Sequence, residues 1–398
     1  MKQLQFKLKI LKMKDVFAIF IFLLMIIPSL MFKLALKIKN KKVWLICDDG
    51  MTARDNGYYL FKYIKENNLN DNVYYVISKD SKDLDKVKKY GNIIYFKSLK
   101  HWLYYMSCNK NIISQKSGNP NSAIFYVLHV YLNLYNNRIF LQHGITKDDA
   151  KWLYYKNTKF KLFVCGAKKE YEYIKNNFGY KDKNIKYLGF SRFDNLHDNV
   201  VNNKQILIMP TWRNWLGRDF NKLNRINSFK ETEYYKKWNS LINNENLINF
   251  IEKNNIQILF YPHINMQKYI NDFNTKSKNI QILNIDYDIQ KVLKESALLI
   301  TDYSSVYMDF AYMSKPIIYY QFDYNEYRQK QYQEGYFKYS KDAFGKLLSD
   351  EEDVVNKIIA YVNMNYRIEN IYMNKINNFF ELKDKNNCKR IYESISHL

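Results

Sequence analysis

The sequence predicts an α/β protein built from two doubly wound domains with parallel sheets. At 398 residues, the chain is long enough for two domains that each bury a core of their own. Hydrophobic residues make up 47% of the chain and aromatic residues 17%, which excludes an intrinsically disordered protein. Short apolar segments alternate with amphipathic ones along most of the sequence, and this alternation is typical of a parallel sheet covered by helices.

The first half of the chain contains a series of short apolar segments that we expect to be strands. Between them lie patterns typical of helices, for example at 58–64, 102–106 and 123–134. The expected strands span residues 42–47, 73–77, 93–96, 111–114, 138–141, 163–166 and 185–189.

The second half restarts the same pattern after a polar, asparagine-rich segment at 197–204, which we expect to link the domains. Strands are expected at 205–209, 256–261 and 280–283, and a helix at 288–296. We therefore predict a basic and hydrophobic segment at 1–40, a first domain at 41–200, a second domain at 205–350 and a helical tail at 351–398.

One βαβ unit in the second half is uninterrupted: a strand at 297–300, a helix at 306–313 and a strand at 317–320. Its turn carries Thr301, Asp302, Ser304 and Ser305 at the helix N-terminus, where the helix dipole favours phosphate oxygens. In open α/β sheets, ligands bind beyond the carboxyl ends of the strands. The alternative is that Thr301 and Ser304 only cap the helix.

Residues 16–32 form an apolar run that is broken only by Pro28 and Ser29. A spanning helix needs about 20 apolar residues, with a lower limit of about 17, so the run is marginal. Lysines on both sides favour a helix that dips into, or lies along, the cytoplasmic leaflet of the membrane. A buried core helix is the alternative, and a cleaved signal peptide is disfavoured because no small-residue cleavage site follows. The lysines are Lys2, Lys7, Lys9, Lys12 and Lys14 before the run, and Lys33, Lys37, Lys39, Lys41 and Lys42 after it.

The net charge of +23 is compatible with a polyanion, an acidic lipid surface or a phosphorylated substrate as partner. Lysine, asparagine, isoleucine and tyrosine are used heavily throughout, so basicity alone does not indicate nucleic acid. No zinc-finger spacing or RNA-recognition signature is present, and we expect no nucleic-acid partner. The widely separated Cys47, Cys108, Cys165 and Cys388 fit reduced thiols better than a disulfide framework or a zinc site.

Polar side chains follow several of the expected strands. His143 follows the strand at 138–141, Thr211 and Arg213 follow the strand at 205–209, and His263 follows the strand at 256–261. Together with the turn at 301–305, they imply a cleft between the two domains, although each histidine alone is more often structural than catalytic. Asp286 and Asp288 have the DxD spacing that metal-dependent glycosyltransferases use to bind a metal ion. Such two-residue matches arise often by chance, and we expect no metal.

These residues resemble the CDP-glycerol glycerophosphotransferases, the family that builds teichoic acid and related poly(alditol phosphate) chains. The similarity covers roughly residues 40–380, and the order and spacing of five motifs make it specific. The motifs are QHG at 142–144, LGFSRFD at 188–194, MPTWR at 209–213, YPH at 261–263, and the unit from ITDYSS at 300–305 to KPII at 315–318.

The resemblance implies a GT-B architecture in which two Rossmann-like domains face each other across a cleft. The C-terminal domain would hold the nucleotide donor and the N-terminal domain the acceptor, and the final helix would cross back to the first domain. We expect a peripheral or single-helix membrane protein, bound to an anionic membrane surface, whose catalytic part is cytoplasmic.

The resemblance also implies a transferase of the EC 2.7.8 type. It would move glycerol phosphate, or another alditol phosphate, from CDP-glycerol or a related CDP-alditol to a lipid-linked or polysaccharide acceptor in teichoic acid or capsule biosynthesis, and release CMP. His143, neutral near pH 7, is the candidate base for the acceptor hydroxyl. His263, if protonated, is the second candidate catalytic residue and would neutralise charge developing on the pyrophosphate. The expected substrate-binding residues are Arg213, Thr211, Thr301, Asp302, Ser304 and Ser305. Such a site can replace a metal ion, and no cofactor is expected.

Two segments depart from the family pattern, at 145–149 and at 334–337. Both segments lie where contacts with the acceptor or the alditol are expected. The departures therefore affect the prediction of the exact substrate more than the prediction of the reaction type. Two rival hypotheses remain from the sequence. One is a GT-B glycosyltransferase that uses a nucleotide sugar, and the other is a non-catalytic protein of the same fold that binds lipids or polyanions.

Overall fold

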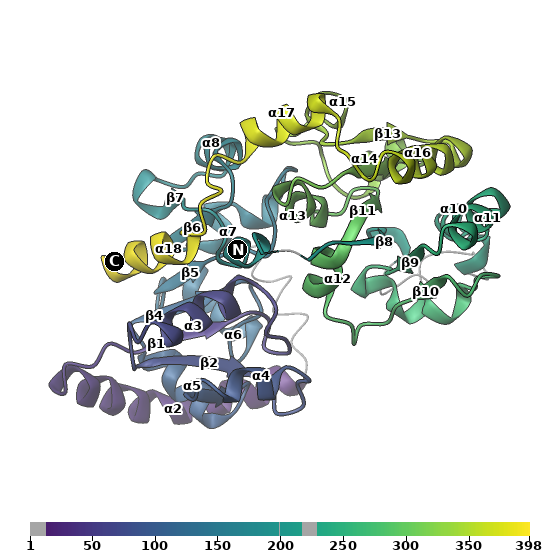
Figure 1. Cartoon of the computed structure of the whole chain (residues 1–398). Helices are drawn as coiled ribbons and strands as arrows, with labels where there is room; N and C mark the ends of the chain where they lie inside the picture. Colours follow the sequence, from purple (N-terminus) through teal and green to yellow (C-terminus); the bar gives the residue numbers. More distant parts are fainter. Residues whose placement is uncertain (1–12, 199, 217–228) are drawn as a thin grey trace. The chain divides into compact units, whose positions relative to one another are not determined.

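The computed structural model describes residues 13–198, 200–216 and 229–398. The chain divides into two compact units (Figure 1). Unit 1 comprises Met1–Ile145, Lys151–Asn195 and Asp384–Leu398, and unit 2 comprises Thr146–Ala150 and Leu196–Lys383. The chain therefore passes between the units more than once, and one crossing follows Ile145. The predicted lysines at positions 2, 7, 9 and 12 lie outside the described residues.

Unit 1 contains a seven-stranded parallel sheet with the order β3-β2-β1-β4-β5-β6-β7. Each strand overlaps one expected from the sequence, because strands covered on both faces are continuous apolar runs that stand out from their surroundings. The strands are β1 (Trp44–Cys47), β2 (Val73–Ile77), β3 (Ile93–Tyr95), β4 (Lys110–Ile113), β5 (Arg138–Phe140), β6 (Leu162–Cys165) and β7 (Ile185–Tyr187). The main helices are α2 (Met13–Ile38), α3 (Asn56–Glu66), α4 (Leu84–Lys88), α5 (Leu99–Ser107), α6 (Ser122–Tyr126), the π-helix η1 (Val127–Tyr131), α7 (Tyr155–Thr158), α8 (Lys168–Asn177) and α18 (Asn387–Ser396).

The two faces of this sheet are covered by different helices. Successive side chains of a strand point to opposite faces. Trp44 and Ile46 of β1 belong to a core that includes residues of α3 and α18. Leu45 and Cys47 belong to a second core, with residues of α2, α5 and α6. The pleat of β1 thus places α2 on the face opposite to α3.

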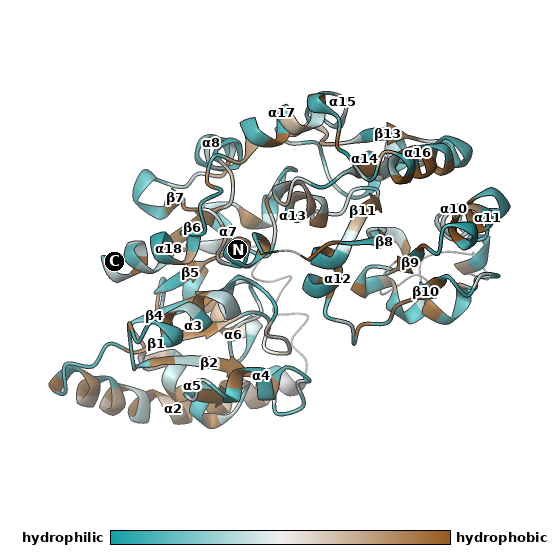
Figure 2. Cartoon of the chain, in the orientation of Figure 1, coloured by the Kyte–Doolittle hydropathy of each residue, from teal (hydrophilic) through white to brown (hydrophobic). Residues whose placement is uncertain are grey.

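Helix α2 has one packed side and one exposed side. Ala18, Met25 and Leu36 are buried in the second core, and Ser107 of α5 donates a hydrogen bond to the backbone oxygen of Ser29 (2.9 Å). The helix is long and apolar enough to cross a membrane, but 17% of its most apolar window is buried in the protein. Figure 2 shows hydrophobic residues along its length. The exposed hydrophobic residues are Val16, Phe17, Ile19, Phe20, Leu23, Leu24, Ile27, Leu30, Met31, Leu34 and Ile38.

Unit 2 contains a six-stranded parallel sheet with the order β10-β9-β8-β11-β12-β13. Its first strand begins at Asn202, inside the expected linker, because Asn202 pairs with Ser296 of β11. The strands are β8 (Asn202–Ile208), β9 (Gln257–Phe260), β10 (Ile280–Ile282), β11 (Ser296–Thr301), β12 (Ile317–Tyr320) and β13 (Lys346–Leu348). The main helices are α10 (Glu233–Leu241), α11 (Glu245–Lys253), α12 (Ile289–Glu295), α13 (Val306–Tyr312), α14 (Tyr324–Lys330), α15 (Tyr339–Asp342), α16 (Glu351–Asn363) and α17 (Asn370–Phe379).

Only the last part of the helical tail belongs to unit 1. Helices α16 and α17 are part of unit 2, whereas α18 contributes Ile391 and Ile395 to the first core of unit 1. Asp194 holds the start of α18, because its carboxylate accepts hydrogen bonds from the Asn387 side chain (2.7 Å) and from the Cys388 backbone (2.8 Å). Gly189, with φ of +77°, lies so close to Asn387 that a Cβ would collide with it.

The two sides of α2 predict opposite effects for neighbouring substitutions. Met25→Glu would bury an unpaired carboxylate and should destabilise the protein by about 3 kcal/mol or more. Leu24→Glu, at a side chain that is 58% exposed, should leave the unfolding temperature almost unchanged. Thermal unfolding of both variants followed by circular dichroism tests this, and equal losses would contradict the two-sided description of α2.

Candidate active site

His143 lies in a loop after β5 whose backbone is held on both sides. Gln142 adopts a φ of +62°, and its side-chain amide donates hydrogen bonds to the Val164 backbone oxygen (2.7 Å) and to Glu170 (3.1 Å). The Asn56 amide in turn donates to the backbone oxygen of Gln142 (2.8 Å). Gln142 is 1% exposed, whereas the His143 side chain is exposed. The loop therefore exposes the imidazole of His143 to solvent, while the hydrogen bonds of Gln142 fix the position of the loop.

Asn56, fully buried at the start of α3, also binds the loop after β7. Its Oδ1 accepts a hydrogen bond from the Arg192 backbone (3.1 Å), and its backbone oxygen accepts one from Ser191 Oγ (2.9 Å). The Arg192 side chain pairs with Asp55 (3.2 Å). Protein packed around the ring and the positive charge of Arg192 lower the pKa of His143, although part of its side chain is exposed. The ring is therefore neutral near pH 7, as a base requires.

A buried carboxyl group, Asp48, closes the carboxyl end of β1. Its Oδ1 accepts hydrogen bonds from Ser114 Oγ (2.7 Å) and the Gly57 backbone (2.9 Å), and its Oδ2 accepts from Tyr75 (2.9 Å) and the Asp55 backbone (3.0 Å). Burial, followed by the nearby charge of Asp55, raises the pKa of Asp48 to about 7. No local sequence pattern indicates this site, because the donors to Asp48 come from three separate segments, at 55–57, Tyr75 and Ser114.

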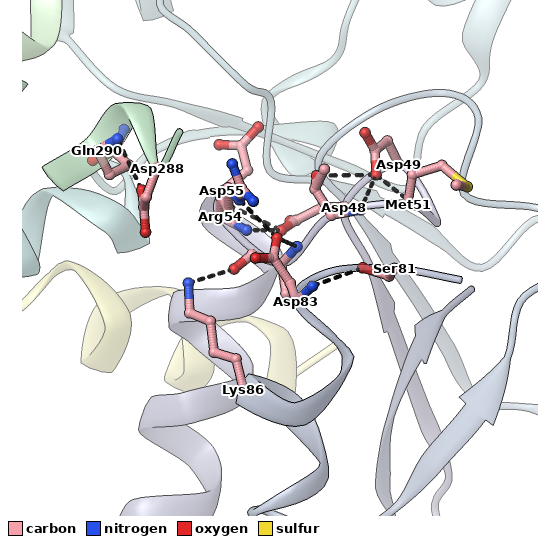
Figure 3. Close-up of polar contacts among 12 residues, drawn as sticks. Asp48, Asp49, Met51, Arg54, Asp55, Ser81, Asp83, Lys86, Asp288 and Gln290 are labelled. Atoms are coloured by element: carbon pink, nitrogen blue, oxygen red, sulfur yellow. Dashed lines mark hydrogen bonds and ion pairs between the residues drawn. The ribbon is translucent and has the colours of Figure 1, made fainter. Parts of the chain in front are cut away.

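A second polar cluster surrounds Asp83 next to the same loop (Figure 3). Asp83 Oδ2 accepts hydrogen bonds from Arg54 Nε (2.8 Å) and from the Ala53 backbone (3.0 Å). Lys86 Nζ donates to the backbone oxygen of Ala53 (2.7 Å). The loop after β1 is thus fixed by charged groups on one side and by Asp48 on the other.

In unit 2, Arg213 is fully buried and joins the loops after three strands. Its guanidinium pairs with Asp302 after β11 (2.9 Å) and with Asp323 after β12 (2.6 Å), and Nη1 donates to the backbone oxygen of Thr211 (3.2 Å). The rings of Tyr303, Tyr327 and Tyr234 lie 5.0–5.2 Å from its central carbon. Arg213 and Asp302 are thus buried in one ion network, and their expected contact with substrate stays a prediction.

The remaining residues of the turn at 301–305 lie close to this ion network. Thr301 Oγ1 donates to the backbone oxygen of Met209 (2.7 Å), and the Thr211 backbone donates to Asp302 Oδ1 (2.8 Å). Ser304 Oγ accepts from the backbone of Val306 (3.4 Å), and Ser305 is half-buried. The structure therefore brings Thr211, Arg213, Thr301, Asp302, Ser304 and Ser305 together at the carboxyl ends of β8 and β11.

His263 follows β9 and has a defined tautomer. Its Nδ1 accepts a hydrogen bond from the backbone N–H of Asn265 (3.2 Å), so the proton of the neutral ring is on Nε2. The ring stacks near Trp212, with centroids 6.2 Å apart. Nε2 is therefore the ring nitrogen that donates, and the charge-neutralising role expected of His263 from the sequence stays a prediction.

The two acidic residues with DxD spacing, Asp286 and Asp288, lie at and just before the start of α12. Asp288 caps α12 by accepting from the backbones of Gln290 (3.1 Å) and Lys291 (3.4 Å), and Asp286 is exposed. Asp309 is buried and accepts from Gln290 Nε2 (3.4 Å). Among the described residues, no group of three or more histidine, cysteine or acidic side chains is arranged to hold a metal ion.

A family model described as CDP-Glycerol:Poly(glycerophosphate) glycerophosphotransferase matches residues 29–397. The chain belongs to this family. It is 40% identical over 367 residues to the minor teichoic acid biosynthesis protein GgaB of Bacillus subtilis (strain 168), a match that covers 90% of the chain and 40% of GgaB. It is 31% identical over 193 residues to a teichoic acid poly(glycerol phosphate) polymerase of Bacillus spizizenii, covering 48% of the chain and 44% of that protein. The chain thus spans less than half the length of these two relatives.

Solved structures show the fold of this family member. The wall teichoic acid polymerase TagF matches with a TM-score of 0.65 at 16% identity, over 93% of the chain and 92% of TagF. A UDP-GlcNAc 2-epimerase from Neisseria meningitidis matches with a TM-score of 0.51 at 11% identity, over 90% of the chain and 100% of the epimerase. These likenesses and the two parallel sheets confirm the predicted GT-B-like α/β fold.

The two segments that depart from the family pattern lie side by side in unit 2. The Asp149 backbone donates to the backbone oxygen of Gln333 (3.1 Å), and Gly335 leaves no room for a Cβ against the backbone of Lys147. Lys147 pairs with Asp148, which also binds Arg328 (2.6 Å). Sequence reasoning missed Arg328, because its partner is 180 residues away.

Removing the buried guanidinium should destabilise unit 2. Arg213→Met leaves Asp302 and Asp323 buried without their counter-charge, and breaking such a pair costs about 3–5 kcal/mol. Urea unfolding would measure the loss, with Arg367→Met at an exposed position of unit 2 as the control. If Arg213→Met kept full stability and only raised KM for the donor, Arg213 would contact substrate instead.

The pKa of Asp48 predicts a pH dependence of stability. Its folded-state pKa of about 7 lies above the ordinary value, so its contribution is complete below a pH of about 4 and is lost as the pH rises through about 7. Asp48→Asn cannot titrate. Its unfolding temperature should therefore fall less between pH 5 and pH 8 than that of the unmodified protein, whatever its absolute stability. Parallel slopes in the two proteins would show that Asp48 is ionised throughout.

Proposed function

We propose that this chain transfers an alditol phosphate from a CDP-activated donor to an acceptor hydroxyl and releases CMP. The match to the glycerophosphotransferase family over residues 29–397 is the observation that carries the proposal. Matched proteins named as poly(glycerol phosphate) and ribitol-phosphate polymerases support CDP-glycerol and CDP-ribitol as the donors to test. The acceptor is a lipid-linked or polysaccharide chain in teichoic acid or capsule biosynthesis.

In the proposed reaction, the acceptor oxygen attacks the phosphorus that carries the alditol. A new P–O bond forms to the acceptor, the bond between this phosphorus and the oxygen of CMP breaks, and CMP leaves with that oxygen. His143 takes the proton of the acceptor hydroxyl, because its lowered pKa keeps the ring neutral. Two hydrogen bonds keep the loop of His143 in one position: the Asn56 amide donates to the Gln142 backbone oxygen, and the Gln142 side chain donates to the Val164 backbone oxygen.

We assign the pyrophosphate of the donor to the strand ends of unit 2. His263 offers the N–H of Nε2, because Nδ1 is occupied by the Asn265 backbone. Ser304 and Ser305 offer hydroxyls in the turn after β11, and Thr211 and Thr301 flank them. Such donors stabilise the negative charge that develops on the leaving phosphate. Arg213 and Asp302 hold the backbone of this turn in place: Arg213 pairs with Asp302, whose carboxylate accepts a hydrogen bond from the Tyr303 backbone.

We further propose that α2 lies along the surface of an anionic membrane. Its exposed side is apolar, and its other side is packed on α5, so the helix fits an interfacial position. Lys33, Lys37, Lys41 and Lys42 line a hollow of about 430 Å³ near its C-terminal end, where lipid phosphates would find positive charge. The proposed enzyme is therefore peripheral, with its catalytic part in the cytoplasm.

The donor class is tested by measuring the nucleotide that is released. The full chain is incubated with a teichoic acid acceptor and, separately, with CDP-glycerol, CDP-ribitol, UDP-GlcNAc and GDP-mannose. We expect CMP from a CDP-alditol and no UDP or GDP. Release of UDP or GDP would instead support the glycosyltransferase hypothesis.

Replacing the proposed base should abolish most of the turnover without unfolding the protein. His143→Ala should lower kcat for CMP release by about 10² to 10⁴, the usual contribution of a general base. His397→Ala, at an exposed histidine of α18's C-terminal end, is the matched control and should keep full activity. Full turnover in His143→Ala would remove the histidine from the mechanism, and unmeasurable turnover in the unmodified chain would support the non-catalytic hypothesis.

A further inference from the structure

Unit 1 contains a cavity of about 700 Å³ that the proposed reaction does not use. This volume lies in the range of small-molecule sites. The cavity is bounded by α2, α6, the π-helix η1 and the start of β5, and most of its lining is apolar, including Ile19, Ala123, Ile124 and Val127.

Helix α2 is fixed to the elements that form the cavity. Asn121, just before α6, donates a hydrogen bond to Asp15 (3.0 Å). Beyond η1, the ring of Tyr135 makes an edge contact with Phe22, with centroids 6.4 Å apart. These contacts tie the cavity to the helix that we assign to the membrane surface.

The apolar lining continues onto the exposed surface of the unit. Ile19 and Tyr131 line the cavity and are 39% and 42% exposed. Their neighbours Phe20 and Leu132 are 63% and 56% exposed. Ile19 of α2 and Tyr131 of η1 thus belong both to the cavity lining and to the exposed apolar surface.

The turn that shapes the cavity is a π-helix. The backbone N–H of Leu132 donates to the oxygen of Val127 (3.1 Å), five residues earlier. π-Helical turns are rare and occur frequently at functional sites, because the wider turn displaces side chains from their α-helical positions. Here the wider turn contributes Val127 and Tyr131 to the lining.

The cavity also contains a cation and an unused hydrogen-bond acceptor. Arg138 is 7% exposed, and its guanidinium donates to Asn136 (3.4 Å) and to the backbone oxygen of Thr158. No carboxylate pairs with it in the part of the chain that the structure describes, and burial lowers its pKa to about 10, so it stays charged at pH 7. Asn119, 9% exposed, has an Oδ1 without a hydrogen-bond partner among the described residues.

We propose that this cavity binds the hydrocarbon chain of a phosphate-bearing membrane lipid. The hydrocarbon chain of the lipid lies along Ile19, Ile124 and Val127, and the lipid phosphate pairs with the guanidinium of Arg138. If the proposed function holds, on which this assignment rests, the lipid is the anchor of the acceptor. The site would then place the growing chain's lipid end on unit 1, the unit that carries His143.

Three soluble probes separate the parts of this ligand. Isothermal titration calorimetry with the full chain should show farnesyl phosphate binding at least about tenfold more tightly than farnesol, because only the phosphate pairs with Arg138. Inorganic phosphate should not bind measurably. Equal affinity for farnesol and farnesyl phosphate, or binding of inorganic phosphate as tight as that of farnesyl phosphate, would overturn the proposal.

A substitution that fills the cavity gives a second, independent test. Ala123→Trp places an indole among the lining residues and should weaken farnesyl phosphate binding by about tenfold or more. Leu132→Trp, at an exposed residue outside the lining, should leave the affinity unchanged. Unchanged binding in Ala123→Trp, with the protein folded, would place the lipid elsewhere.

Turnover distinguishes a failure of this inference from a failure of the proposed function. We expect Ala123→Trp to release CMP normally with a water-soluble acceptor and more slowly with a lipid-linked one. Equal rates with both acceptors would overturn the lipid site while the proposed transferase stands. Absence of CMP release by the unmodified chain with either acceptor would overturn the proposed function. The calorimetric titrations with farnesyl phosphate would still test the lipid site in that case.

Discussion

A buried guanidinium holds together the loops on which the proposed donor site of unit 2 stands. Strands β8, β11 and β12 are neighbours in the sheet, so the loops after them meet at one edge, and Arg213 binds all three. Two carboxylates and one cation leave this cluster with net negative charge, which the backbone N–H groups of Thr211 and Tyr303 and the hydroxyl of Tyr303 compensate as hydrogen-bond donors. A phosphate placed directly beside it would be repelled. The cluster is therefore better suited to shaping the turn at Ser304 than to binding the donor itself.

In unit 1, an uncharged side chain joins the loops after β5 and β7. The amide of Asn56 reaches the loops after β5 and β7, and Asp48 collects donors from segments that are distant in the sequence. An amide can donate and accept at once, so one fully buried side chain satisfies both loops without a counter-ion. This leaves the positive charge of Arg192 as the nearest electrostatic influence on His143.

The strands and several site residues could be predicted because their signals are local. The strands Val73–Ile77 and Ile317–Tyr320 have the bounds expected from their apolar runs, and His143 and His263 follow strands as expected. Strand β13 was missed because it is short, begins with a lysine and lies at the edge of the sheet. The burial of Arg213 and the role of Arg328 depend on partners far away in the sequence, and no local pattern reports such pairs. For α2, composition alone fits both a core helix and a membrane helix, and only the packing of its two sides separates them.

The path of the backbone has a mechanical consequence for the proposed base. Ile145 ends one segment of unit 1, and Thr146–Ala150 belong to unit 2 before the chain returns at Lys151. His143 is thus joined to unit 2 by a tether of only a few residues, each able to span at most about 3.6 Å. So short a tether has little slack, and its end in unit 1 is held by the hydrogen bond from the Asn56 amide to the Gln142 backbone. A displacement of Thr146–Ala150 would therefore be passed along the backbone to the loop of His143.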